Sequence, residues 1–101
     1  MLRRIVETPQ YRDWFTSLRD DRGRDRIAIR IRRLADGNPG IHRSLSRGLR
    51  ALKIDVGPGY RVYYVERGGC VILLLAGGDK STQKVDIEVA ISLMDNYTEP
   101  A

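Results

Sequence analysis

Apolar side chains near the start of the chain recur at intervals of three and four residues, a spacing typical of one buried helix face, at Tyr11, Trp14, Phe15 and Leu18. Thr8 is suited to the N-cap of this helix and Pro9 to its first position, because the amide hydrogen that proline lacks would be unpaired there. Trp14 and Phe15 are therefore predicted to pack in the core rather than to stack on nucleic-acid bases. Residues 2–6, before the helix, are strand-like.

A second helix is predicted over residues 23–36, after a break at residues 20–23. Its buried stripe consists of apolar residues at the same helical spacing, namely Ile27, Ala28, Ile31, Leu34 and Ala35. Arginines cover much of the remaining surface, at Arg22, Arg24, Arg26, Arg30, Arg32 and Arg33. Gly37 is suited to a left-handed C-cap, and Pro39 prevents the helix from continuing. The two helices form an αα-hairpin whose arginine face is either a solvated surface or a site for phosphate or a protein partner.

The apolar period changes from 3.6 to two after the second helix, which predicts strands. Glycine-containing turns separate three strands, at residues 49–55, 60–66 and 71–76. The last of these is an unbroken apolar run, typical of a central strand covered on both faces. A final helix is predicted within residues 82–96, with Ile87, Ile91 and Met94 facing the core. The order β-α-α-β-β-β-α predicts an α+β fold with two N-terminal helices and an antiparallel sheet.

Length and composition are those of one globular domain over residues 1–101, with 42% hydrophobic and 31% charged residues. The net charge of +5 favours an acidic partner such as a nucleic acid or an acidic protein. The single cysteine, Cys70, opens an apolar run and is predicted to be buried as a small hydrophobic residue. Neither a signal peptide nor an apolar run long enough for a membrane span is evident, so a cytoplasmic protein without membrane association is predicted.

Cations and phenols, rather than metal ligands, make up the candidate chemistry. The histidine, His42, falls in a predicted loop, and no cysteine and histidine spacing fits zinc. The glycine-containing turns match neither a Walker A nor a dinucleotide-binding motif. Lys53 on one strand, and Arg61 with Tyr63 on the next, are predicted to face one side of the sheet, within reach of Lys80. They are either solvated strand residues or a site for phosphate chemistry without a metal or cofactor.

Two motifs carry a family resemblance, Gly57-Pro58-Gly59-Tyr60-Arg61 and Gly77-Gly78-Asp79-Lys80. Together with residues 48–54 and 73–76 and with Asp86, they resemble the RelE/HigB-like toxins of type II toxin–antitoxin modules, the addiction-module killer proteins of the RelE/ParE superfamily. The resemblance implies a RelE-like fold and a metal-independent endoribonuclease that cuts mRNA, typically on a translating ribosome. It also implies a cognate antitoxin as partner, a small helix-turn-helix protein.

The resemblance also implies roles for individual residues. The catalytic set carried over by position is Lys53, Arg61, Lys80 and Tyr63. The residues expected to contact RNA are Arg47, Arg50, Asp79 and Gln83. Ala51 stands where relatives often have a glutamate, which leaves the general acid and base open. Lys53 is the candidate base, and Lys80 or Tyr63 the candidate proton donor.

Two other functions are compatible with the same fold. One is a ParE-like toxin that inhibits DNA gyrase by protein binding and has no ribonuclease activity. The other is a non-catalytic module that binds a nucleic acid or a protein partner. The convergence of Lys53, Arg61 and Lys80 favours the nuclease, because a gyrase inhibitor needs no such set of cations.

Overall fold

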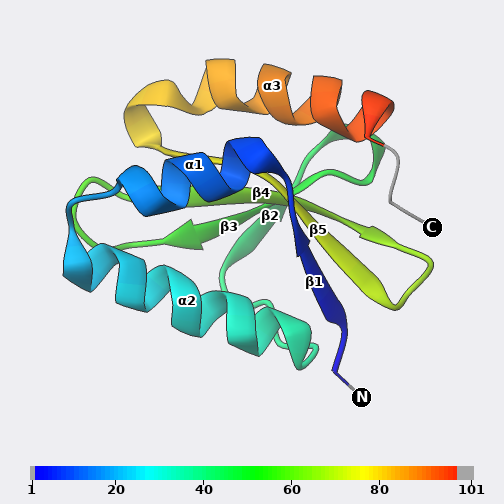
Figure 1. The fold of residues 1–101 in the computed structure, drawn as a ribbon, viewed down its shortest axis with the longest axis horizontal. Helices are drawn as coiled ribbons and strands as arrows, with labels where there is room; N and C mark the ends of the chain where they lie inside the picture. Colours follow the sequence, from blue (N-terminus) through cyan, green and yellow to red (C-terminus); the bar gives the residue numbers. More distant parts are fainter. Residues whose placement is uncertain (1, 98–101) are drawn as a thin grey trace.

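Residues 2–97, which the computed structural model describes, form a five-stranded sheet with helices packed on both faces (Figure 1). The strands are β1 (Arg4–Glu7), β2 (His42–Ser44), β3 (Arg50–Ile54), β4 (Tyr60–Arg67) and β5 (Val71–Asp79). The helices are α1 (Pro9–Ser17), α2 (Asp21–Ala35) and α3 (Gln83–Asn96), with short 3₁₀ turns at Ser46–Gly48 and Lys80–Thr82. The predicted α+β class is confirmed.

The sheet is mixed rather than antiparallel, with the strand order β1-β5-β4-β3-β2. Strands β3, β4 and β5 form the predicted antiparallel meander, but β1 pairs with β5 in parallel. The predicted element order also lacks β2, whose three residues are all exposed and show no apolar alternation. Strand direction depends on the path of the chain between the strands, which apolar spacing does not encode.

Each face of the sheet has its own apolar core. One lies against α1 and α2 and includes Tyr11, Ile27, Leu34, Leu52, Val62 and Leu74. The other lies against α3 and includes Ala51, Tyr63, Leu73, Leu75, Ala90 and Met94. Figure 1 shows α3 on one side of the sheet, and α1 and α2 on the other. Trp14 and Phe15 pack against the first core, as predicted.

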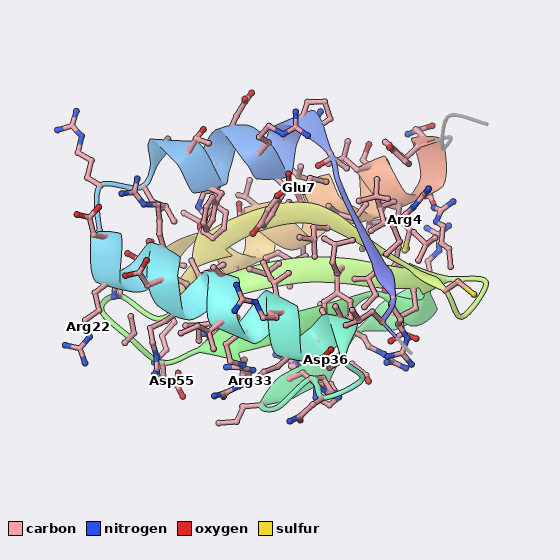
Figure 2. All side chains as sticks on the ribbon, turned by 60° about the horizontal axis from the view of Figure 1, so that its bottom comes forward. Arg4, Glu7, Arg22, Arg33, Asp36 and Asp55 are labelled. Carbon is pink, nitrogen blue, oxygen red and sulfur yellow. The ribbon has the colours of Figure 1, made fainter. Side chains whose placement is uncertain are left out.

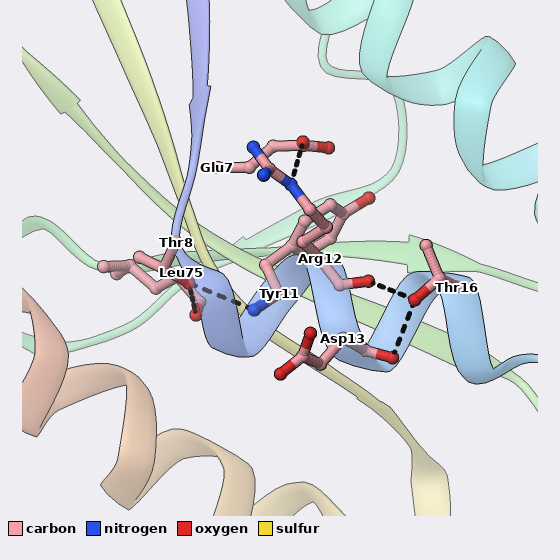
Figure 3. A network of polar contacts seen from close by, with 7 residues as sticks. All are labelled: Glu7, Thr8, Tyr11, Arg12, Asp13, Thr16 and Leu75. Carbon is pink, nitrogen blue, oxygen red and sulfur yellow. Dashed lines mark hydrogen bonds and ion pairs between the residues drawn. The ribbon is translucent and has the colours of Figure 1, made fainter.

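The start of α1 follows the predicted capping pattern. The Tyr11 amide donates to Thr8 Oγ1 over 3.1 Å, so Thr8 is the N-cap, and Pro9 begins the helix (Figure 3). The Thr8 hydroxyl also donates to the carbonyl of Leu75 on β5 over 2.6 Å. Thr8 is fully buried, and these two bonds satisfy its side chain. They also fix the turn from β1 into α1 against the central part of the sheet.

The second helix begins at Asp21, earlier than predicted, because the Asp20 side chain accepts a hydrogen bond from the Gly23 amide. Gly37 has a φ of +92° and provides the predicted left-handed end. Of the predicted stripe, Ile27, Leu34 and Ala35 are buried and Ile31 is partly buried, but Ala28 is exposed. The prediction for Ala28 is wrong because the buried stripe is narrower than the run of apolar residues. Among the arginines of α2, Arg22 and Arg33 are exposed (Figure 2).

Arg30 is the arginine of α2 that ties the helix to the sheet. Its guanidinium donates to the carbonyls of Lys53, Pro39 and Ile41 at 2.6, 3.0 and 2.8 Å. The amide of Lys53 donates to the same Ile41 carbonyl at 3.0 Å. One side chain therefore holds α2, the segment before β2, and β3 together.

Replacing Arg30 with methionine is expected to lower the free energy of unfolding by about 2–3 kcal/mol, because three carbonyls lose a charged donor. Urea unfolding measures this change. Arg33→Met is the matched control on the same helix and should change stability by less than about 0.5 kcal/mol. Equal effects of the two substitutions would show that the hydrogen bonds of Arg30 do not stabilise the fold.

Cys70 is exposed, so the prediction that it is buried is wrong. It lies in the turn between β4 and β5, and β5 begins only at Val71. The apolar run in the sequence therefore starts one residue before the chain enters the sheet. Within residues 2–97, no helix combines the length and apolar character that crossing a membrane requires.

Candidate functional site

The two motifs that carry the resemblance lie side by side at one end of the sheet. The Gly57-Pro58-Gly59 turn leads into Tyr60, whose Cα partner on β5 is Asp79. Lys80 comes next, and its side chain crosses Gly59, since a β-carbon on Gly59 would lie 2.8 Å from Lys80 Cε. Gly59 also has a φ of +80°, which glycine adopts without strain. The backbone conformation therefore favours glycine at this turn, and any larger residue would also displace the Lys80 side chain.

Lys53, Arg61 and Gly78 are Cα partners in one row across β3, β4 and β5. The β-carbons of directly opposed residues lie about 4.5–5.5 Å apart, so Lys53 and Arg61 are neighbours. Tyr63, two positions after Arg61, faces the same side and belongs to the core against α3. The structure thus brings Lys53, Arg61 and Tyr63 to one face, with Lys80 at the end of β5.

Arg61 and Tyr63 are buried on this face. Arg61 is 5% exposed and Tyr63 is 0% exposed, whereas Lys53 is partly buried and Lys80 is exposed. The interpretation of Arg61 and Tyr63 as solvated strand residues is therefore wrong, because α3 covers this part of the sheet. Arg61 Nη1 donates to the Tyr60 carbonyl at 3.0 Å. Arg61 Nε and the Tyr63 hydroxyl have no hydrogen-bond partner among the described residues.

Asp86 on α3 and Thr82 before it also lie beside this row, although no site role was predicted for either of them. The Thr82 hydroxyl donates to Asp86 Oδ2 at 2.5 Å. A β-carbon on Gly78 would stand 1.8 Å from the same Asp86 oxygen, so the carboxylate lies directly on the backbone of β5. We call Arg61, Tyr63, Thr82 and Asp86 the polar cluster. The signal in the sequence was the i, i+4 spacing of Thr82 and Asp86 after a glycine pair.

The electrostatics of the polar cluster keep Tyr63 protonated. Burial raises the pKa of its hydroxyl to about 12, and the Asp86 carboxylate adds to this rise, while the positive charges of Arg61 and Arg43 oppose it. At neutral pH the phenol is therefore a hydrogen-bond or proton donor and not a base.

Arg43 is a further cation that the sequence analysis missed, because β2 was predicted to be a loop. It is exposed and pairs with Ala51, which in turn pairs with Tyr63. Its neighbour His42 also lies in β2 and not in a loop, and its ring nitrogen Nδ1 contacts the Gly40 carbonyl at 2.8 Å. Positive charge therefore extends from Arg61 across β3 to the edge of the sheet.

The four residues expected to contact RNA lie in three different places. Arg50 lies on the opposite face, 3.7 Å from Glu66 in an ion pair. Arg47 pairs with Asp95 near the C-terminal end of α3. The structure brings neither arginine to the polar cluster.

Asp79 and Gln83 lie next to Lys80, but each already has a local partner. Asp79 Oδ1 accepts from the amide and the hydroxyl of Ser81 at 2.8 and 2.5 Å, and these bonds lower the pKa of its carboxyl. Gln83 Nε2 donates to the Lys80 carbonyl at 3.3 Å. Asp79 therefore caps the 3₁₀ turn that leads into α3.

The chain is 43% identical over 86 residues to an uncharacterized protein of Haemophilus influenzae. The aligned segment covers 85% of this chain and 87% of that protein, so the two correspond over most of their length. The chain belongs to the family of this Haemophilus protein. No family model matches the chain.

Other features of residues 2–97 lie apart from the polar cluster. A pocket of about 330 Å³ is lined by Leu2, Arg3, Asp36, Gly37, Gly69 and Cys70, none of which belongs to the cluster. Within this part of the chain, no group of three or more histidine, cysteine, aspartate or glutamate side chains could hold a metal ion.

The chemistry available at the cluster is the stabilisation of negative charge. Arg61 offers an unpaired N–H, and Tyr63 offers an unpaired O–H. Lys53 on β3 and Lys80, in the 3₁₀ turn after β5, add positive charge. A guanidinium binds two oxygens of a phosphoryl group in a fixed geometry, and an ammonium adds a point charge. This combination suits a phosphodiester that becomes more negative during reaction.

Proposed function

We propose that this chain has a RelE-like fold and is the toxin of a type II toxin–antitoxin module, acting as a metal-independent endoribonuclease. The observation that carries the proposal is the row formed by Lys53 and Arg61, with Lys80 at the end of the next strand and Arg61 Nε unpaired. The resemblance of the surrounding motifs to RelE/HigB-like toxins supports the same reaction. mRNA on a translating ribosome, in the cytoplasm, is the proposed substrate.

In the proposed reaction, the ribose 2′-oxygen attacks the adjacent phosphorus, and the bond from phosphorus to the 5′-oxygen breaks. Lys53, in its neutral form, takes the 2′-hydroxyl proton. Arg61 donates to the phosphoryl oxygens as their negative charge increases. Tyr63 or Lys80 protonates the departing 5′-oxygen, and Tyr63 suits this role because its high pKa keeps it protonated. The products are a 2′,3′-cyclic phosphate and a free 5′-hydroxyl.

The proposed protein partner is a cognate antitoxin, a small helix-turn-helix protein with an acidic segment. The net charge of +5 supports an acidic partner. Exposed arginines of α2, including Arg22, Arg26 and Arg33, provide a basic surface on the side of the sheet opposite the polar cluster. Binding of the antitoxin is proposed to neutralise the toxin.

One observation favours a second function. Arg61 and Tyr63 are 5% and 0% exposed, so RNA cannot reach them in the conformation described. If they only stabilise the fold, the chain acts by binding, either as a ParE-like inhibitor of DNA gyrase or as a non-catalytic module that binds a nucleic acid or a protein.

The ends of cleaved RNA distinguish these functions. Purified protein is expected to cut RNA, free or on translating ribosomes, and to leave 2′,3′-cyclic phosphate ends; cleavage of free RNA should persist in excess EDTA. Lys53→Met should slow cleavage by about 10²–10⁴-fold, the range for loss of a general base. Arg12→Met is a charge-matched control, since Arg12 is 66% exposed on α1, on the other side of the sheet.

Two outcomes would contradict the proposed ribonuclease function or its mechanism. Intact RNA in both settings, with folded protein, would reject the nuclease and favour the binding function. Cleavage of free RNA that EDTA blocks and added Mg²⁺ restores would reject the reaction based on cations alone.

A further inference from the structure

The N-terminal end of α3 closes over the two buried donors of the polar cluster. We call residues 80–86, which comprise the 3₁₀ turn and the start of α3, the cover. The carboxylate of Asp86, at the end of the cover, lies on Gly78, the Cα partner of Arg61. Arg61 Nε and the Tyr63 hydroxyl are therefore enclosed and unpaired beneath a helix N-terminus. Buried donors without partners are rare in folded proteins, and a catalytic role or a bound water or ion is among the reasons for them.

The cover is attached more weakly than the rest of α3. Most of its residues are exposed, and Thr82 makes no capping hydrogen bond to the amides of α3. Its side-chain hydrogen bonds are short-range, chiefly the bond from Thr82 to Asp86. Its contacts with the sheet are those of Lys80 over Gly59 and of Asp86 on Gly78. The buried residues of α3, Ala90 and Met94, both lie in its C-terminal half. Segments with few buried apolar contacts open more readily than the core.

The C-terminal half of α3 has additional attachments. Arg67 donates to the Met94 carbonyl at 2.7 Å, and Arg47 pairs with Asp95. The cover can therefore open while the remainder of α3 stays on the sheet.

We propose that Arg61 and Tyr63 form an oxyanion site beneath the N-terminus of α3, and that the cover opens to admit the phosphate of an RNA strand. Opening removes the Asp86 carboxylate, which would repel the phosphate, and exposes the unpaired N–H and O–H groups. This inference rests on the proposed function, because it identifies how the substrate of that reaction reaches its site.

The test compares two substitutions that each remove one carboxylate from α3. Asp86→Asn weakens the bond from Thr82, whereas Glu88→Gln changes an exposed residue. In the absence of RNA, hydrogen exchange in the cover is expected to be at least about 10-fold faster in Asp86→Asn than in Glu88→Gln. Exchange in residues 90–96 should be the same in the two variants. A short RNA with 2′-O-methyl groups, which cannot be cleaved, should bind Asp86→Asn at least 10-fold more tightly than Glu88→Gln.

A second substitution keeps the proposal testable if Asp86→Asn folds poorly. Thr82→Val removes the same hydrogen bond without changing the charge and should also speed exchange in the cover. Thr16→Val is its control, since Thr16 bonds only to carbonyls of α1. The proposal would be overturned if hydrogen exchange in the cover were as slow as exchange in β4 in every variant. A cover that opens in a protein that leaves RNA intact would instead reject the nuclease function and retain the oxyanion site.

Discussion

Arg61→Met is expected to reduce RNA cleavage by about 10²–10³-fold, the usual cost of removing one donor to a developing oxyanion. The fold should persist, because methionine fills most of the space of the buried arginine and leaves no unpaired nitrogen. Arg61→Ala is a poorer test, since a residue that is 5% exposed would leave a cavity. Initial cleavage rates and the midpoint of thermal unfolding, measured on the same preparations, separate catalysis from stability.

Two further variants make the result specific to the guanidinium. Arg61→Lys keeps the positive charge but not the paired N–H groups, so it should recover only part of the lost rate. Arg12→Met removes an exposed arginine from α1 and should cleave RNA at the rate of the unmodified protein. Cleavage by Arg61→Met within a few-fold of normal, at unchanged thermal stability, would remove Arg61 from the proposed site.

Gly78→Ala is expected to lower the free energy of unfolding by about 1–3 kcal/mol, because the added methyl group overpacks the sheet beneath α3. The new β-carbon would stand 1.8 Å from Asp86 Oδ2 and 2.7 Å from Thr82 Oγ1. The φ of Gly78 is not positive, so the effect is steric and not a matter of backbone strain. Urea unfolding measures the loss directly.

A double-mutant cycle identifies the atom responsible. Removal of the carboxylate in Asp86→Ala makes room for the methyl group, so Gly78→Ala should cost less than half as much in that background. Equal costs in the two backgrounds would mean that Asp86 does not lie on Gly78.

Local features of the fold follow from the sequence because their causes lie within a few residues of one another. Thr8 caps α1, and Gly37 ends α2 in a left-handed conformation. Each depends on the side chain or backbone freedom of the residue itself. The period of two likewise places Lys53 and Arg61 on predictable faces of β3 and β4. Sequence alone therefore identified two members of the central row of the candidate site.

Features that depend on distant segments were decided only by the tertiary structure. Neither the parallel pairing of β1 nor the short strand β2 has a local apolar signal. Strand β2 adds Arg43 to the positive charge at the edge of the sheet. The polar cluster forms because α3 returns across β4 and β5, which encloses Arg61 and places Asp86 on Gly78. Alternation shows which side of a sheet a residue faces, but not whether a helix covers that side. That coverage is a packing contact between segments far apart in the chain, and it makes Arg61 and Tyr63 buried donors rather than surface residues.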